Sequence, residues 1–229
     1  MRALRKLLII AVVLGGLLAV GDRLAAGVAE REAAGRIQAN QGLAAEPDVS
    51  VGGFPFLTQL LAKEFDRVDV ALTGLEVTAG DHRVRVGELQ AELHGVRMEN
   101  DYARAVATTA TGTARISYDE LRKTTDSDVT LAYGGEGKIK ITGGVEVLGQ
   151  KLTRSVLSTV SVVDGDTLRM RADEVPGGGI PGIEELVRQR TDFDRRVSGF
   201  PAGLAIEKVE ATPDGLAVTV GGRNVVVTG

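Results

Sequence analysis

Residues 67–93 read RVDVALTGLEVTAGDHRVRVGELQAEL, and this stretch decides the fold. Apolar residues alternate with polar ones along it, which is the period of a β-strand with one buried face. The parity of the alternation changes at Gly87, and this slip predicts a β-bulge there. The alternating apolar positions are Val68, Val70, Leu72, Val84, Val86, Leu89, Ala91 and Leu93.

The same period of two recurs through the rest of the chain and predicts about ten strands in all. Short glycine-containing turns join successive strands, which favours antiparallel pairing, and no βαβ alternation is present. We therefore predict an α+β fold built on a long curved antiparallel sheet. The further strands are expected at 106–116, 129–133, 139–141, 145–147, 152–163, 168–172, 204–209, 216–220 and 225–228.

Helical segments are expected near both ends of this run of strands. Residues 22–41 carry a thin apolar stripe of Leu24, Val28 and Ile37 with Ala between them, which predicts a helix lying on another surface. Residues 118–123 predict one or two helical turns, and residues 183–197 predict a charged amphipathic helix.

Residues 49–65, VSVGGFPFLTQLLAKEF, contain the strongest local anomaly of the sequence. Three of the five Phe lie within 54–65. Pro55 suits the first turn of a helix. A short strand at 49–51 should precede that helix. Its predicted apolar face consists of Phe56, Leu57, Leu60, Leu61 and Phe65.

The first 21 residues read as a secretory signal or a membrane anchor. Arg2, Arg5 and Lys6 precede a run of fourteen residues, Leu7 to Val20, without a polar side chain. Small residues at Ala19 and Gly21 permit cleavage, whereas the helix predicted after Gly21 would continue a retained anchor. Both readings place the body, residues 22–229, outside the cytoplasmic membrane as a single domain.

Composition excludes several classes of function. Cys is absent and only two His are present, so disulfides, thiolate zinc sites and imidazole-rich metal sites are not expected. The first 21 residues hold three of the 27 basic residues and none of the 31 acidic ones, so the body carries a net charge of −7. An acidic body without Trp does not favour nucleic-acid binding. We expect neither a metal nor a cofactor.

No catalytic centre emerges from the spacing of reactive residues. A Gly-x-Ser-x-Gly elbow is absent, and His82 and His94 are best read as exposed turn residues. Asp164 with Asp166 suits a turn, and Asp192 with Asp194 would point apart on a helix. We therefore predict that the chain is not an enzyme, although converging carboxylates in a structure would reopen that question.

The order of features resembles the LmeA-like (DUF2993) family of actinobacterial cell-envelope proteins. The resemblance rests on GFPFLTQ at 53–59, VDVALTGL at 68–75 and FPAGLAIEKV at 200–209. It implies a tubular lipid-binding fold of the BPI/SMP-like kind, with a curled sheet around helices. It also implies binding of phosphatidylinositol-type phospholipids and a link to lipoglycan maturation.

An aliphatic sheet face with few aromatic residues also describes an acyl-chain groove. We therefore predict an extracytoplasmic phospholipid-binding protein. A membrane-tethered interaction module with a dry core is the alternative. The residues expected to contact acyl chains are Phe54, Phe56, Leu57, Leu60, Leu61, Phe65, Val70, Leu72, Leu131 and Ile141.

Overall fold

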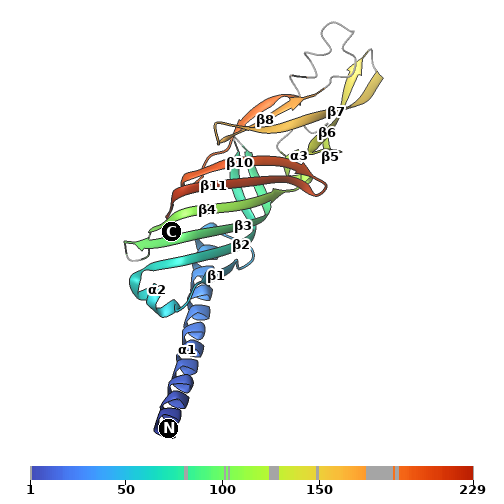
Figure 1. The fold of residues 1–229 in the computed structure, drawn as a ribbon. Coiled ribbons are helices and arrows are strands. Elements are labelled where there is room, and N and C mark those ends of the chain that lie inside the picture. The colour runs from blue at the N-terminus through green and yellow to red at the C-terminus, as the bar shows by residue number, and fades with distance from the viewer. Residues whose placement is uncertain are drawn as a thin grey trace.

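The protein consists of a long N-terminal helix and two antiparallel sheets, seen in a computed structural model (Figure 1). The structure describes residues 2–79, 82–100, 102, 104–123, 129–147, 150–173, 188 and 191–228. The helices are α1 (Arg2–Gln41), α2 (Phe56–Ala62) and α3 (Tyr118–Arg122).

The first sheet has six strands in the order β1-β2-β3-β4-β11-β10, and the second has five in the order β5-β6-β7-β8-β9. The strand pairings of the described residues are antiparallel throughout, so the predicted α+β fold with a curved antiparallel sheet is confirmed. The strands of the first sheet are β1 (Asp48–Gly52), β2 (Glu64–Ala79), β3 (His82–Glu99), β4 (Arg104–Ile116), β10 (Ala202–Thr212) and β11 (Gly215–Thr228). Those of the second are β5 (Val129–Gly135), β6 (Lys138–Val147), β7 (Gln150–Val163), β8 (Thr167–Ala172) and β9 (Phe193–Arg196).

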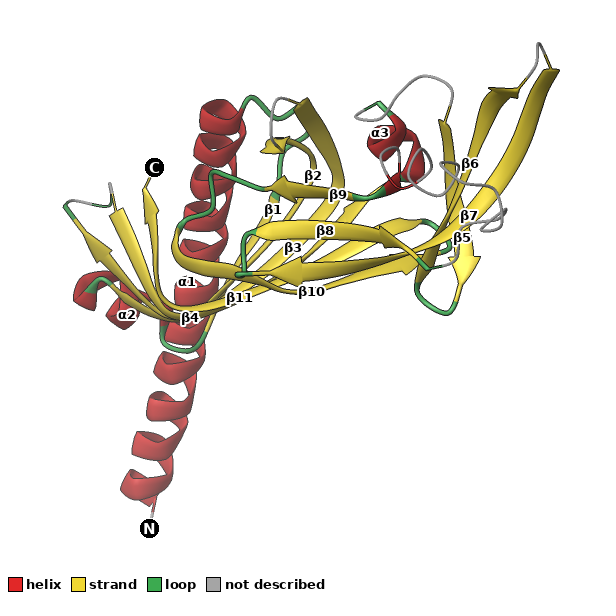
Figure 2. Ribbon diagram, turned by 90° about the horizontal axis from the view of Figure 1, so that it is seen from above, coloured by secondary structure: helices red, strands yellow, loops and turns green. Residues whose placement is uncertain are grey.

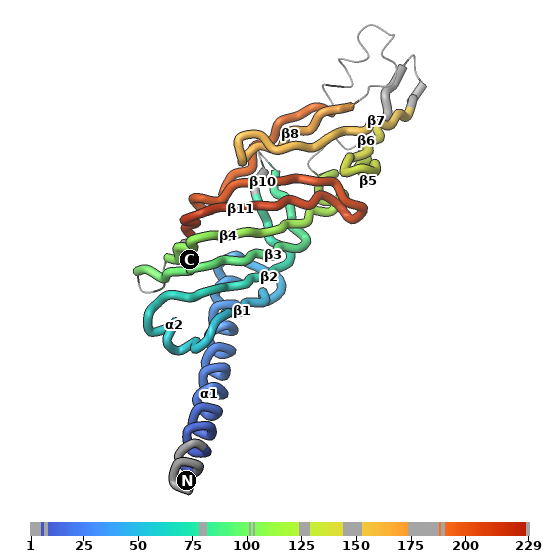
Figure 3. Tube along the Cα trace, viewed as in Figure 1, coloured from blue at the N-terminus to red at the C-terminus, as the bar shows by residue number. Residues whose placement is uncertain are grey.

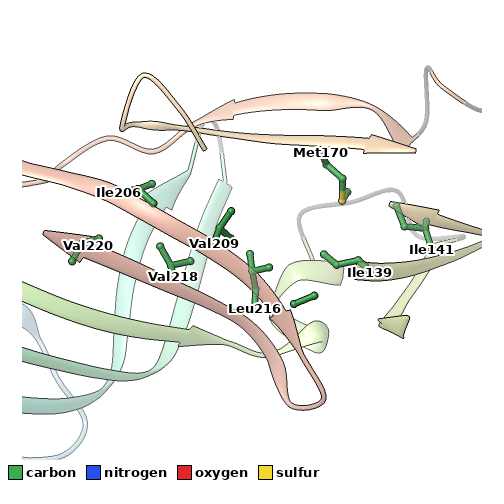
Figure 4. Close-up of a cluster of buried hydrophobic side chains, with 9 residues drawn as sticks. Ile139, Ile141, Met170, Ile206, Val209, Leu216, Val218 and Val220 are labelled. Carbon is green, nitrogen blue, oxygen red and sulfur yellow. The ribbon is translucent and has the colours of Figure 1, made fainter. Parts of the chain in front are cut away.

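The two sheets follow one another along an elongated body (Figure 3). A cluster of buried aliphatic side chains joins them, with Ile139 and Met170 from the second sheet facing Ile206 and Leu216 from the first (Figure 4). The backbone N–H of Ile206 also donates to the carbonyl of Gly165 at 2.7 Å. The joint is therefore held by both packing and a main-chain hydrogen bond.

The prediction of a β-bulge at Gly87 is wrong, because the pairing of β2 with β3 keeps its register there. Pairs on either side of it, Thr73 with Glu88 and Leu75 with Val86, keep one register, so no extra residue is inserted. Gly74, across from Gly87, has a φ of +74°. The change in parity of the apolar residues therefore occurs on both strands, at Gly74 in β2 and at Gly87 in β3. It turns Val86 toward the same buried cluster as Leu89, despite their opposite parity.

Helix α1 runs without a break through the predicted boundary at residues 21 and 22. Its second half packs on the β1 side of the first sheet (Figure 2). Two members of the predicted contact stripe are wrong, because Leu24 and Val28 are 68% and 65% exposed, whereas Ile37 is half-buried. Alanines make the closest contact, and Ala26 and Ala34 are buried. Small side chains let the helix lie close to its neighbours.

The helix after Pro55 is shorter than predicted. Lys63 adopts a left-handed conformation with a φ of 56° and ends α2 after Ala62. Phe65 therefore lies in β2 and not on the helix, yet its ring still stacks on Phe56 at 6.2 Å.

The helix predicted over residues 183–197 is wrong at its end, where Phe193–Arg196 form strand β9 beside β8. Residues 183–187, 189 and 190 lie outside the described part of the chain. Asp194 accordingly lies on a strand and not on a helix, and its carboxylate binds Arg169 of β8.

Candidate functional site

The GFPFLTQ segment is fastened to helix α1 by a buried carboxylate. Asp22 is only 3% exposed, and its two oxygens accept the backbone N–H groups of Phe56 and Leu57, each at 2.8 Å. Pro55, at the N-cap of α2, offers no side-chain cap. Asp22 therefore satisfies donors that a helix leaves unpaired at its start.

Two further side chains of α1 continue this attachment. Arg23 donates to the carbonyl of Gly53 at 2.7 Å, and its guanidinium lies 5.6 Å from the ring centre of Phe54. Glu30 accepts the N–H of Val51 at 2.8 Å, and so occupies a donor on the edge strand β1. The helix thereby covers a sheet edge that could otherwise pair with another chain.

Gly53 and Gln59 explain why the motif has this sequence. Gly53 has a φ of +92°, and a Cβ there would lie 2.6 Å from the amide nitrogen of Gln59. Gln59 is buried, donates to the carbonyl of Gly52 at 3.3 Å and accepts the N–H of Asp66 at 2.8 Å. Glycine and glutamine together close the loop between β1 and β2.

The environment of Asp22 keeps its carboxyl ionised. Desolvation by burial opposes the charge, but the hydrogen bonds from Leu57 and Phe56 and the charge of Arg23 outweigh it. The pKa of Asp22 is therefore lowered from its ordinary value.

One face of the first sheet is an apolar surface that crosses all six strands. Side chains of directly paired residues share a face, so the register defines rows across the sheet. The middle row consists of Val49, Val70, Ala91, Gly112, Val220 and Ile206. A second row consists of Val51, Val68, Leu93, Ala110, Gly222 and Leu204.

The centre of this face carries small side chains. Ala110, Gly112 and Ala114 follow one another on β4, while larger aliphatic residues stand on the outer strands. A cluster with α1 and α2 covers the second row and reaches Val225 on β11, and a cluster with the second sheet covers the β10 and β11 end of the middle row. Val70 and Ala91 are partly exposed and, among the described residues, belong to neither cluster. They mark the uncovered part of the face.

The opposite face of the same sheet is polar. A shallow groove of about 420 Å³ there is lined by Arg67, Asp69, Gln90, Glu92 and Thr111, among others. The guanidinium of Arg67 lies 2.9 Å from Asp69 and 3.3 Å from Glu92. Because its charges pair with one another, this groove is a poorer host for an acyl chain than the apolar face.

The residues predicted to contact acyl chains fall into separate places. Phe56, Leu60 and Phe65 pack in the cluster against α1. Leu131 and Ile141 pack in the cluster between the sheets. Val70 and Leu72 lie on the apolar face of β2. The exposed members of the set are Phe54, Leu57 and Leu61. The structure thus distributes the ten residues over four separate groups.

Asp166 and Asp194, two of the acidic residues considered for catalysis, are bound in ion pairs. Asp166 accepts from Thr167 and Arg196, at 2.7 and 2.6 Å, and these hydrogen bonds lower its pKa. The guanidinium of Arg169, hydrogen-bonded to Asp194, likewise lowers the pKa of that carboxyl. Among the described residues, no group of three or more His, Asp or Glu could hold a metal ion.

Sequence reasoning missed Asp22, Gln59 and Ala91. Asp22 is the first acidic residue after the apolar run, and that position was an available signal. Ala91 was recognised as a strand residue, but its place in the middle of an apolar row depends on the pairing of β3 with β2 and β4.

The fold and this face define an α+β protein with a long N-terminal helix and an apolar sheet surface, the kind of surface that apolar ligands occupy. The LmeA-like phospholipid-binding family matches residues 20–221 of the 229, and the chain belongs to that family. Comparison with curated proteins and with solved structures finds no significant match. The apolar part of α1 is long enough to cross a membrane, and a signal sequence has the same properties.

Proposed function

We propose that this chain is a membrane-anchored, extracytoplasmic protein that holds phospholipid acyl chains on the apolar face of its first sheet. The family match supports phospholipid as the ligand class. The observation that carries the proposal is the uncovered part of the middle row, where Ala91 lies between Val70 and Gly112.

The energetics of acyl binding fit this surface. Each CH₂ group removed from water contributes about 0.8 kcal/mol, so aliphatic contacts alone can retain a long chain. The small side chain of Ala91 stands beside Val70 in this row, while the side chain of Val220 reaches over Gly112, where a Cβ would lie 3.1 Å from its Cγ2. We propose a headgroup of the phosphatidylinositol type from the family resemblance, and the geometry of the face concerns the acyl chains.

The direction of the anchor follows from the charges around it. Arg2, Arg5 and Lys6 precede the apolar run, and basic residues favour the cytoplasmic side of a membrane. The body then lies on the far side. Since the chain has no Cys, a single Thr130→Cys variant can be labelled on intact cells with a membrane-impermeant maleimide. Labelling before lysis supports this topology, and labelling only after lysis contradicts it.

Photo-crosslinking tests the acyl-binding face directly. A benzophenone amino acid replaces Val70 or Ala91 in the full chain, expressed in its host membrane, and crosslinked phospholipid is detected by mass spectrometry. The neighbouring positions Asp69 and Gln90 are matched controls, because successive side chains of a strand point to opposite faces. Crosslinks at Val70 and Ala91 alone support the proposal.

Absence of lipid at all four positions, in protein that co-purifies with no phospholipid, would sink the proposal. The chain would then be a tethered interaction module. Equal crosslinking on both faces would also contradict it, because a site on the apolar face cannot label Asp69 or Gln90.

A further inference from the structure

Helix α2 exposes apolar side chains where a folded domain normally buries them. Phe54 is 60% exposed, Leu57 44% and Leu61 85%. Leu57 and Leu61 are four residues apart and so share one face of the helix. We call Phe54, Leu57 and Leu61 the α2 patch. None of its members takes part in the buried clusters of the described residues.

The position of the α2 patch is fixed relative to the apolar half of α1. Asp22 lies two residues beyond the apolar run that ends at Val20, a rise of about 3 Å along the helix. The same Asp22 binds the first turn of α2 through Phe56 and Leu57. Figure 1 shows α2 beside α1 at the point where the apolar half of that helix leaves the body.

The length of α1 places this point at a bilayer surface. The apolar run from Leu7 to Val20 has a length of about 21 Å, and the whole helix from Arg2 to Gly21 measures about 30 Å, which is about the thickness of the hydrocarbon core. The basic residues at its start can extend toward the opposite headgroups. When this segment spans a bilayer, Asp22 and the first turn of α2 lie at the headgroup level.

The surroundings of the α2 patch suit that level. Arg23 lies over the ring of Phe54, and Lys63 lies 5.4 Å from the ring centre of Tyr102. Tyr102 is 38% exposed and donates to the carbonyl of Leu60 at 3.2 Å. Aromatic and basic side chains beside exposed leucines are typical of membrane interfaces.

We propose that the α2 patch inserts into the outer surface of the bilayer that α1 spans. This inference rests on the anchoring part of the proposed function and is independent of acyl binding on the sheet. The bilayer is the favoured occupant because the covalent anchor holds the patch against it. A second copy of the chain would need no such alignment with the apolar run.

Single tryptophans test the proposal, since the chain contains no Trp. Full-length Leu61→Trp, Leu57→Trp and Leu14→Trp variants are reconstituted in phosphatidylcholine–phosphatidylglycerol vesicles with nitroxide-labelled lipids. Leu157→Trp is the matched control, because Leu157 is an exposed aliphatic residue on the second sheet. Emission spectra and quenching by shallow and deep labels are recorded.

We expect blue-shifted emission at residues 57 and 61, quenched more strongly by the shallow label than by the deep one. The deep label should quench residue 14 more strongly, and neither label should quench residue 157. Emission and quenching at residue 61 equal to those at residue 157 would overturn the proposal. So would protection from aqueous acrylamide without lipid quenching, which indicates a protein partner. Loss of quenching at residue 14 removes the anchor and the proposal with it, whereas crosslinks at Val70 test acyl binding separately.

Discussion

The carboxylate of Asp22 in α1 accepts the backbone N–H of Phe56 at the start of α2, 2.8 Å away. This bond connects the N-terminal helix to the segment between β1 and β2 of the first sheet. Because α2 has no side-chain cap of its own, the link replaces one that most short helices carry locally. Asp22 therefore attaches the apolar segment of α1 directly to the folded body.

Replacing Asp22 with alanine should loosen α2 from α1. The two N–H groups at the start of the helix lose their acceptor, and we expect the melting temperature to fall by a few degrees. Asp22→Asn retains one acceptor oxygen, so its melting temperature should fall less. Glu32→Ala is the control, because Glu32 is an exposed residue of the same helix. Equal melting temperatures for Asp22→Ala and Glu32→Ala would contradict the capping role.

Acid should destabilise the second sheet. Hydrogen bonds from Arg169 lower the pKa of Asp194, and those from Thr167 and Arg196 lower that of Asp166, below the ordinary 3.8. A lowered folded-state pKa gives stability that is present above pH 3.8 and is lost as the pH falls through the folded-state value. Denaturant midpoints should therefore be level at neutral pH and fall below pH 3.8. In a double Asp166→Asn, Asp194→Asn variant, the denaturant midpoint should fall less steeply below pH 3.8.

Phe56 and Phe54 are two residues apart, and their substitution should have opposite consequences. Phe56 is 2% exposed and stacks on Phe65, so Phe56→Ala should lower the free energy of unfolding by about 3–5 kcal/mol. Phe54→Ala removes an exposed ring and should change the free energy of unfolding by about 0.5 kcal/mol or less. Chemical denaturation of the two variants makes the comparison, and similar losses would show that the burial of Phe56 is misassigned.

The sequence could predict the strands and the membrane-length helix because both depend on local periodicity. The alternation at Val68, Val70 and Leu72 reports one buried face whatever covers it. The same alternation cannot show that Gly74 compensates the slip at Gly87, because that correction depends on which residues of β2 and β3 are paired.

The candidate site was predicted less well, for a related reason. Phe65 continues the helical spacing of Phe56, but a left-handed Lys63 ends the helix before it. On α1 the alanines and not Leu24 or Val28 face the body, because close approach favours the smaller side chain. A ranking by hydrophobicity alone would place Leu24 and Val28 at the contact ahead of the alanines, which is the reverse of the observed order of burial.

Ser158 offers a substitution that should stabilise the protein. Its side chain is fully buried on β7, and its hydroxyl finds no hydrogen-bond partner among the described residues. An unpaired buried hydroxyl costs about 1–3 kcal/mol, so Ser158→Ala should raise the free energy of unfolding by about 1 kcal/mol. Ser155→Ala, at an exposed position bonded to Thr142, is the control and should be neutral or slightly destabilising. A loss of stability in Ser158→Ala would indicate that the hydroxyl has a partner.

Filling the small centre of the apolar face should block acyl binding without unfolding the sheet. Ala91 is partly exposed, lies between Val70 and Gly112 in the middle row, and belongs to none of the buried clusters of the described residues. An Ala91→Phe side chain can therefore occupy the space proposed for the lipid and not an already packed core. We expect a several-fold loss of lipid crosslinking at Val70 with an unchanged melting temperature. Gln90→Phe places the same ring on the polar face and should leave crosslinking intact. If Ala91→Phe binds lipid as the unmodified chain does, the acyl chain lies elsewhere.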